Sequence, residues 1–135
     1  MTMMESIQEM LGTAEQWTEN GGVHWLNPGA SQVRDVAAVM NKAHARFVTI
    51  TAIQIPGEQW LRLEYLWDLD GQLVGFPFQI SGNSIESIYD LSEAVDWIER
   101  EIHEGFAIDF VGREYEPLLL RPGDKPGVNL HEALL

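Results

Sequence analysis

The chain of 135 residues contains no cysteine. It therefore has no disulfide and no cysteine nucleophile, and it lacks the thiolates that hold iron–sulfur clusters almost without exception. Zinc sites usually use thiolate or histidine ligands, and the four histidines have no partners at ligand spacing. If the protein serves redox chemistry, another chain must carry the electrons.

Basic residues are scarce. The 8 lysines and arginines face 21 acids, which gives a formal charge of −13. Such a field repels phosphate backbones and anionic lipid headgroups, so binding to nucleic acid and electrostatic binding to membranes are both unfavourable. A basic or mixed-charge protein partner is compatible with this charge. The alternative, that the acidity only keeps the protein in solution, stays open.

Long apolar runs are also missing. The longest uncharged stretches are interrupted by polar residues, glycine or proline, and none approaches the roughly twenty apolar residues that a membrane-spanning helix needs. The opening "MTMMESIQEM" has neither a basic region nor a long apolar run, so no secretory signal is expected. A cytoplasmic location follows by default.

The first part of the chain reads as two helices around a short strand. Apolar residues recur at helical spacing over 5–18, and "NGG" at 20–22 stops the run. The apolar stretch 23–26 is a possible strand. After a turn, Ser31 is a plausible N-cap for a second helix that reaches about Ala45.

The middle of the chain changes to the period of strands. Strands are predicted over 46–55, 60–70 and 72–81, the second with nearly strict alternation of apolar and polar residues. "DG" at 70–71 indicates a hairpin. Pro77 cannot donate to a ladder, so the third strand should lie at an edge or carry a bulge.

A third helix is predicted from about Ser87 to Glu104, and regular pattern fades after Gly112. These elements indicate an α+β fold. We expect an antiparallel sheet of three to four strands, with about three helices packed mainly on one face. The predicted organisation is a single domain over 1–114, followed by an extended C-terminal arm over 115–135.

The segment "WIEREIHEGFAIDF" (97–110) carries the densest charge of the last helix. On a helical wheel Arg100 points away from the apolar stripe, and Glu99 and Glu101 fall on opposite flanks. Acid–base catalysis needs carboxylates that converge on a cleft, and these two diverge. We therefore predict no catalytic, cofactor-binding or metal-binding residue in this chain.

Trp97 lies beside the polar face of the same helix. A large aromatic residue there is either covered by the arm or the first helix, or it is an interface anchor, since Trp and Arg are enriched at interface hot spots. The charged helix then reads as an ordinary solvated face or as a docking surface.

The stretch "SIYDLSEAVDWIEREIHEGFAIDFVGREYEPLLL" resembles the 30-kDa subunit family. This family comprises the 30-kDa subunit of respiratory complex I (NADH-quinone oxidoreductase) and its counterparts in energy-converting membrane-bound nickel–iron hydrogenases and formate hydrogenlyases. The resemblance covers roughly residues 20–120. The matching positions are Trp97, Glu99, Arg100, Glu101, Glu104, Phe106, Ile108, Phe110 and Gly112.

Several positions depart from the pattern of the family. Gly105 stands where a bulky apolar residue is usual, Ala107 replaces a glycine, and Arg113 stands where histidine or lysine is common. The long C-terminal extension of complex I versions is missing, so the chain is more similar to the short hydrogenase subunits.

The resemblance implies a non-catalytic structural or assembly subunit in the cytosolic arm of such a complex, peripheral to the inner membrane through its partners. It would dock on the large subunit of a hydrogenase or quinone oxidoreductase, near an iron–sulfur subunit. The partners would carry the iron–sulfur clusters or the nickel–iron centre. The residues expected to form or support the contact are Trp97, Glu99, Arg100, Glu101, His103, Phe106, Arg113, Leu118 and Leu120.

The alternative is a free-standing acidic protein-binding module that has kept the fold but not the complex. Whether Glu99 and Glu101 pair within the chain or with a partner is open at this stage. If either is buried, a group of opposite charge must accompany it, because an unpaired buried charge costs several kcal/mol.

Overall fold

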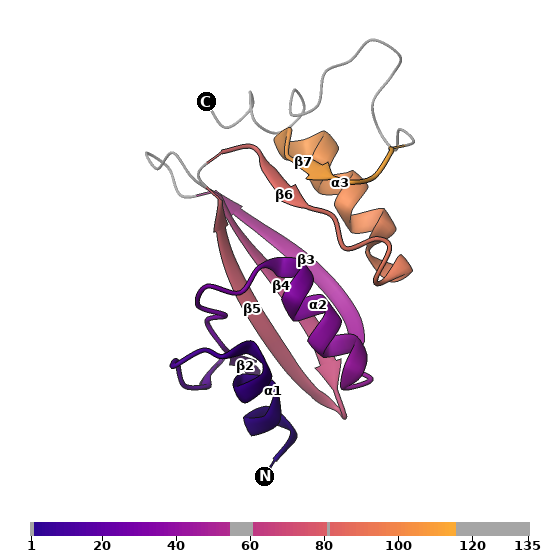
Figure 1. Ribbon diagram of the computed structural model, residues 1–135. Coiled ribbons are helices and arrows are strands. Elements are labelled where there is room, and N and C mark those ends of the chain that lie inside the picture. Colours follow the sequence, from indigo (N-terminus) through magenta and orange to yellow (C-terminus); the bar gives the residue numbers. More distant parts are fainter. Residues whose placement is uncertain (1, 55–60, 81, 116–135) are drawn as a thin grey trace.

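A computed structural model describes residues 2–54, 61–80 and 82–115 (Figure 1). Within this part the chain forms three α-helices, one short 3-10 helix and seven strands. In chain order they are α1 (Met3–Leu11), β1 (Thr18–Asn20), β2 (Val23–Trp25), α2 (Val33–Lys42), β3 (Arg46–Gln54), β4 (Leu61–Leu69), β5 (Gln72–Ile80), β6 (Ser84–Glu86), η1 (Glu93–Val95), α3 (Asp96–Phe106) and β7 (Asp109–Val111).

The predicted α+β class is confirmed, with a larger and mixed sheet. Five strands pair in the order β1-β2-β5-β4-β3, and β2 runs parallel to β5 while the other pairs are antiparallel. The chain passes from β2 through α2 to the far edge, and the β3-β4-β5 meander then returns to β2. The three residues of β1 are all exposed and polar, so no alternation in the sequence marked this strand.

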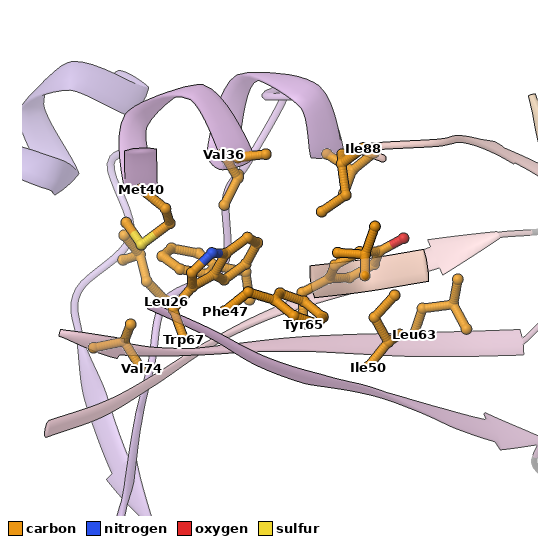
Figure 2. Close-up of a cluster of buried hydrophobic side chains, with 14 of the residues drawn as sticks. Leu26, Val36, Met40, Phe47, Ile50, Leu63, Tyr65, Trp67, Val74 and Ile88 are labelled. Atoms are coloured by element: carbon orange, nitrogen blue, oxygen red, sulfur yellow. The ribbon is translucent and has the colours of Figure 1, made fainter. Parts of the chain in front are cut away.

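The core lies between the sheet and its helices. Every second residue of β4, from Leu61 to Leu69, is buried, as the alternation predicted. Trp67 is central among these residues. Its ring makes edge-to-face contacts with Phe47 and Phe76 at centroid distances of 5.6 and 5.8 Å. Figure 2 shows Trp67 and Phe47 among the buried side chains of this cluster. The apolar faces of α1, α2 and the α3 region complete this one cluster.

The β4–β5 turn and Pro77 fit their predicted roles. Asp70 and Gly71 both have positive φ, 52° and 87°, which is the conformation of a tight hairpin turn. Pro77 pairs with Glu64 on one side. On its other side β2 pairs with β5 only as far as Gly75, so β5 is an interior strand at its start and an edge at Pro77.

On the sheet face opposite the core, Trp25 lies against the backbone of β5. A Cβ atom at Gly75 would come within 2.5 Å of the Trp25 ring and 2.9 Å of Leu66 Cδ2. Glycine at this position therefore lets the indole lie directly on the sheet.

The first helix is shorter than its pattern predicted. Thr2 caps it, with a hydrogen bond from the Glu5 amide to the threonine hydroxyl, and Gly12 ends it in the left-handed conformation. Trp17 continues the helical spacing but lies beyond the helix. It packs instead on Phe76, with 5.9 Å between ring centroids.

The second helix also differs at both ends. Ser31 is not its cap, because the Ser31 hydroxyl donates to the Leu11 carbonyl 2.9 Å away, and Gln32 occupies the cap position. The helix ends at Lys42. His44, which falls within the predicted range of this helix, lies beyond its end, is exposed and has a positive φ of 58°.

The third helix begins at Asp96 and not near Ser87. The residues before it were predicted to form a loop and the first turns of this helix. They form β6 and η1 instead, and β6 pairs in parallel with β7. Short strands of three residues leave too little alternation to be recognised in the sequence.

No helix among the described residues is long and apolar enough to cross a membrane. The predicted arm over 115–135 lies outside the described residues except for its first position, Tyr115.

Candidate partner-docking surface

The helix α3 presents one face to the core and the other to solvent. Ile102 and Gly105 are buried on its inner face, as the apolar stripe predicted. Two acids are buried with them. Glu99 is 0% exposed and Glu104 is 5% exposed, although the helical wheel gave Glu99 a place on a flank.

The Glu99 carboxylate accepts hydrogen bonds from three donors. The Ser87 hydroxyl lies 2.7 Å from Oε1 and the Ile88 amide lies 3.0 Å from Oε2. Arg113 Nη1 donates to Oε1 over 3.2 Å. The buried carboxylate of Glu99 thus has a counter-charge within the chain. Such a counter-charge was expected, because burying an unpaired charge costs several kcal/mol. Glu99 pairs within the chain.

Arg113 links the end of β7 to the start of α3. Its side chain is only 7% exposed, and its second terminal nitrogen donates to the Asp96 carboxylate. The guanidinium also lies over the rings of Tyr89 and Tyr115, 4.8 and 5.0 Å from their centroids. Arg113, which departs from the family pattern, is therefore an internal connector in this protein. We call Ser87, Asp96, Glu99 and Arg113 the inner clamp.

Glu99 in the inner clamp and Tyr65 beside it both have raised pKa values. Burial raises the pKa of Glu99, and the donors Ser87, Ile88 and Arg113 offset part of that rise. Burial also raises the pKa of Tyr65 well above its ordinary value, and the nearby Glu99 charge adds to the effect. Among the described residues the Tyr65 hydroxyl has no hydrogen-bond partner. The clamp thus sits directly against the apolar core.

The outer face of α3 is different. Trp97 is 60% exposed, the largest exposed fraction among the large exposed hydrophobic residues of the described chain. The Arg100 guanidinium lies 5.7 Å from the centre of its ring and pairs with Asp96 at 3.1 Å. Asp96 and Arg100 are four residues apart and so lie on neighbouring turns of the same helix face. Glu93 and Glu101 are exposed one turn to either side of Trp97.

His103 and Phe106 lie at the C-terminal end of α3 and are both half-buried. His103 Nδ1 donates to the Ile108 carbonyl at 2.8 Å, and the ring stacks on Tyr115 with 3.8 Å between centroids. Ala107 ends the helix in the left-handed conformation with φ 57°. The histidine thus fixes the turn that leads from α3 into β7.

A groove of about 510 Å³ runs along the N-terminal half of α3. Its described lining contains Tyr89, Asp90, Asp96, Arg100, Gly112, Arg113, Glu114 and Tyr115. Asp96 and Glu99 converge on Arg113 of the same chain, a contact that the divergence predicted for Glu99 and Glu101 did not address. Within the described ranges no group of three or more potential metal ligands occurs.

The predicted contact residues therefore separate into four sets. Trp97 and Glu101 are exposed, whereas Glu99 and Arg113 are bound inside the chain and can only support a contact. Arg100, His103 and Phe106 are partly buried, and the Arg100 side chain is only 16% exposed although it points away from the apolar stripe on the helical wheel. Leu118 and Leu120 lie outside the described residues. Sequence reasoning missed Ser87, Tyr89 and Tyr115, because their roles depend on a tertiary contact across β6, α3 and β7.

A family model for the respiratory-chain NADH dehydrogenase 30 kDa subunit matches residues 27–131. The chain belongs to this family. The match runs from the entry into α2, through the sheet and α3, and so includes the segment on which the resemblance was based. This membership makes the protein a relative of complex I subunits.

Two solved structures of the family fold are similar to this chain. One comes from the membrane-bound sulfane sulfur reductase, an archaeal respiratory membrane complex, with a TM-score of 0.73 and 19% identity over 92% of this chain and 79% of that chain. The other is the trypsin-resistant fragment of Nqo5, with a TM-score of 0.64 and 17% identity over 85% of this chain and 100% of that chain. Both structures share the fold of this chain. No curated protein sequence matches significantly.

Proposed function

We propose that this protein is a non-catalytic structural or assembly subunit. It docks on the large catalytic subunit of a complex I-like enzyme or a membrane-bound nickel–iron hydrogenase. Family membership supports its place in an oxidoreductase complex. The division of α3 into a paired inner face and an exposed outer face supports docking as its role.

The single observation that carries the proposal is the exposure of Trp97. A ring that is 60% exposed beside Arg100 has the composition of an interface hot spot. Glu93 and Glu101 lie to either side of it. The matching surface on the partner is an apolar pocket with lysine or arginine at its rim.

The partner subunits hold the redox groups in this proposal. The chain has no cysteine for a cluster. Iron–sulfur clusters or a nickel–iron centre then belong to the large subunit and a neighbouring iron–sulfur subunit. The chain reaches the cytoplasmic side of the inner membrane only through these partners.

Co-purification tests the proposal. The chain is tagged in its native host, membranes are solubilised, and the bound proteins are identified by mass spectrometry. Recovery of a stoichiometric large subunit, together with loss of that recovery in Trp97→Ala, is the expected result. Recovery of no such subunit contradicts the proposal and favours the free-standing acidic module.

Met10→Ala is the matched control. Met10 is 47% exposed on α1, on another element of the molecule. Its truncation should leave the recovery of the large subunit unchanged. Equal losses of the large subunit in both variants would show that any exposed apolar side chain contributes to its recovery. That result contradicts a defined docking face.

A further inference from the structure

The two edges of the five-stranded sheet are built differently. β1 forms one edge with three exposed polar residues, including Glu19. β3 forms the other with nine residues, and in the described part of the chain it pairs only with β4. From Phe47 to Gln54 it contains no charged residue and no proline.

Within the described residues no further strand pairs with this edge, and such an edge is unusual in a protein that functions alone. The free backbone groups of an edge strand are a template for another strand, and proteins normally protect them with charge, proline or a short length. Among the described residues β3 has a bulge between Phe47 and Thr49, and η1 and α3 also pack against part of the strand. Beyond the bulge, the strand continues in regular register from Thr49 to Gln54.

The exposed side chains of β3 also suit a partner. Val48 and Ile53 are 42% and 37% exposed, and Thr51 is exposed between them. Branched side chains of this type pack well against a neighbouring strand. A strand added here would place alternate residues beside Thr51 and Ile53 on one face and beside Ile50 and Ala52 on the other.

Charge decides between the two kinds of strand that could pair here. A second copy of this chain would bring together two molecules of formal charge −13, which repel each other. A neutral or basic partner meets no such repulsion. The edge itself is uncharged beyond Arg46, so the strand that fits it is uncharged as well.

We propose that an uncharged extended segment of the large partner subunit, rich in β-branched residues, adds to β3 at residues 49–54. This is β-augmentation, in which backbone hydrogen bonds provide affinity and alternate side chains provide specificity. The inference rests on the proposed function, and it adds a second contact, on the sheet edge, to the one on the outer face of α3.

The test uses the complex of the full chain with the co-expressed large subunit, compared with the chain alone, by amide hydrogen exchange. We expect exchange at residues 49–54 to slow by about tenfold or more in the complex, because newly paired amides exchange only on opening. Amides of β1 should change less than about twofold. A complex that forms without protection of β3 overturns the inference and leaves the proposed function standing.

A lysine substitution gives the second measurement. Thr51→Lys places a charge on the exposed side of β3 and should weaken binding to the large subunit by about tenfold or more. Thr18→Lys on β1 is the matched control and should change binding by less than about twofold. Melting temperatures of the free variants show that both fold.

Three further outcomes count against the inference. Equal binding by Thr51→Lys and the parent chain overturns it. So does concentration-dependent protection of β3 in the chain alone, which would identify a second copy as the occupant. Failure of the large subunit to co-purify with the parent chain overturns both the inference and the proposed function.

Discussion

Both faces of α3 carry acidic side chains, but the two faces have different roles. Glu99 faces inward, is fully buried and accepts three hydrogen bonds within the chain. Trp97, two residues earlier, faces outward and is 60% exposed. At these two positions the usual distribution is reversed, since the acid is inside and the large aromatic ring is outside. The inner face stabilises the fold, and the outer face is left for a partner.

The largest effect is expected from removing the buried acid. Glu99→Ala leaves Ser87, Ile88 and Arg113 without their common acceptor, and breaking a buried pair costs about 3–5 kcal/mol. Urea denaturation measures the loss of unfolding free energy. Glu101→Ala, on the exposed side of the same helix, is the control and should change stability by less than about 0.5 kcal/mol. A loss below about 1 kcal/mol for Glu99→Ala would remove the distinction between the two faces.

The second prediction concerns the outer face. Trp97→Ala should weaken binding to the large subunit by about 2 kcal/mol, or about thirtyfold, because central aromatic residues carry much of an interface energy. Unfolding free energy should change by less than about 0.5 kcal/mol. Titration calorimetry and urea denaturation separate the two quantities. If stability falls and binding does not, Trp97 belongs to the fold and not to an interface.

A smaller effect is expected at Tyr115, which closes the clamp from the β7 side. Its hydroxyl accepts from the Phe110 amide and donates to the Phe110 carbonyl. Tyr115→Phe should cost about 1 kcal/mol, the usual worth of such bonds. Thermal denaturation at neutral pH measures it. Tyr89→Phe is the control, since the Tyr89 ring also lies against Arg113.

Tyr115 also gives the inner region a dependence on high pH. Burial is the main cause that raises the pKa of Tyr115 from 10.0 to about 12. Because the folded pKa lies above the unfolded one, its contribution to stability is complete below pH 10 and is lost as the pH rises through about 12. Absorbance of tyrosinate at 295 nm should lose a late-titrating component in Tyr115→Phe. An unchanged titration curve would contradict this assignment.

The smallest effect on stability is expected at an exposed ion pair, in contrast to the buried pair of the inner clamp. Arg34 on α2 binds Asp90 through two bonds of 2.8 Å, and hydrogen bonding to Arg34 lowers the pKa of Asp90. This ion pair therefore stabilises the folded protein at pH values above the ordinary pKa of a carboxyl group. The stabilisation is lost as the pH falls through the lowered pKa of Asp90. Asp90→Asn should therefore lower the melting temperature slightly at pH 7 and not at all in strong acid. A difference that persists in strong acid would show another cause.

The sequence predicted the elements with strong periodicity. The alternation of β4, the "DG" turn and the buried positions Ile102 and Gly105 of α3 are all found, because each depends on residues close together in the chain. Elements of three residues were missed, and helix ends shifted where a local contact decided them. Ser31, for example, bonds to Leu11 across the α1–α2 contact and does not cap its own helix.

The inner clamp could not be predicted in the same way. A helical wheel places Glu99 by angle alone, but Ser87 and Arg113 decide whether that angle is buried. These residues come from before β7 and after it, and they meet through the parallel pairing of β6 with β7. The wheel placed Trp97 beside the polar face, but whether the arm or the first helix covers it was left open, and the structure gives it 60% exposure.

The parallel pairing of β2 with β5 determines when the sheet can be completed during translation. Trp25 can pack against Gly75 only after the whole β3-β4-β5 meander has been translated. Until then the N-terminal hairpin has an uncovered indole and no sheet to join. Nascent chains released before β5 emerges should hence be substrates for chaperones, whereas chains extended past Ile80 can complete the sheet.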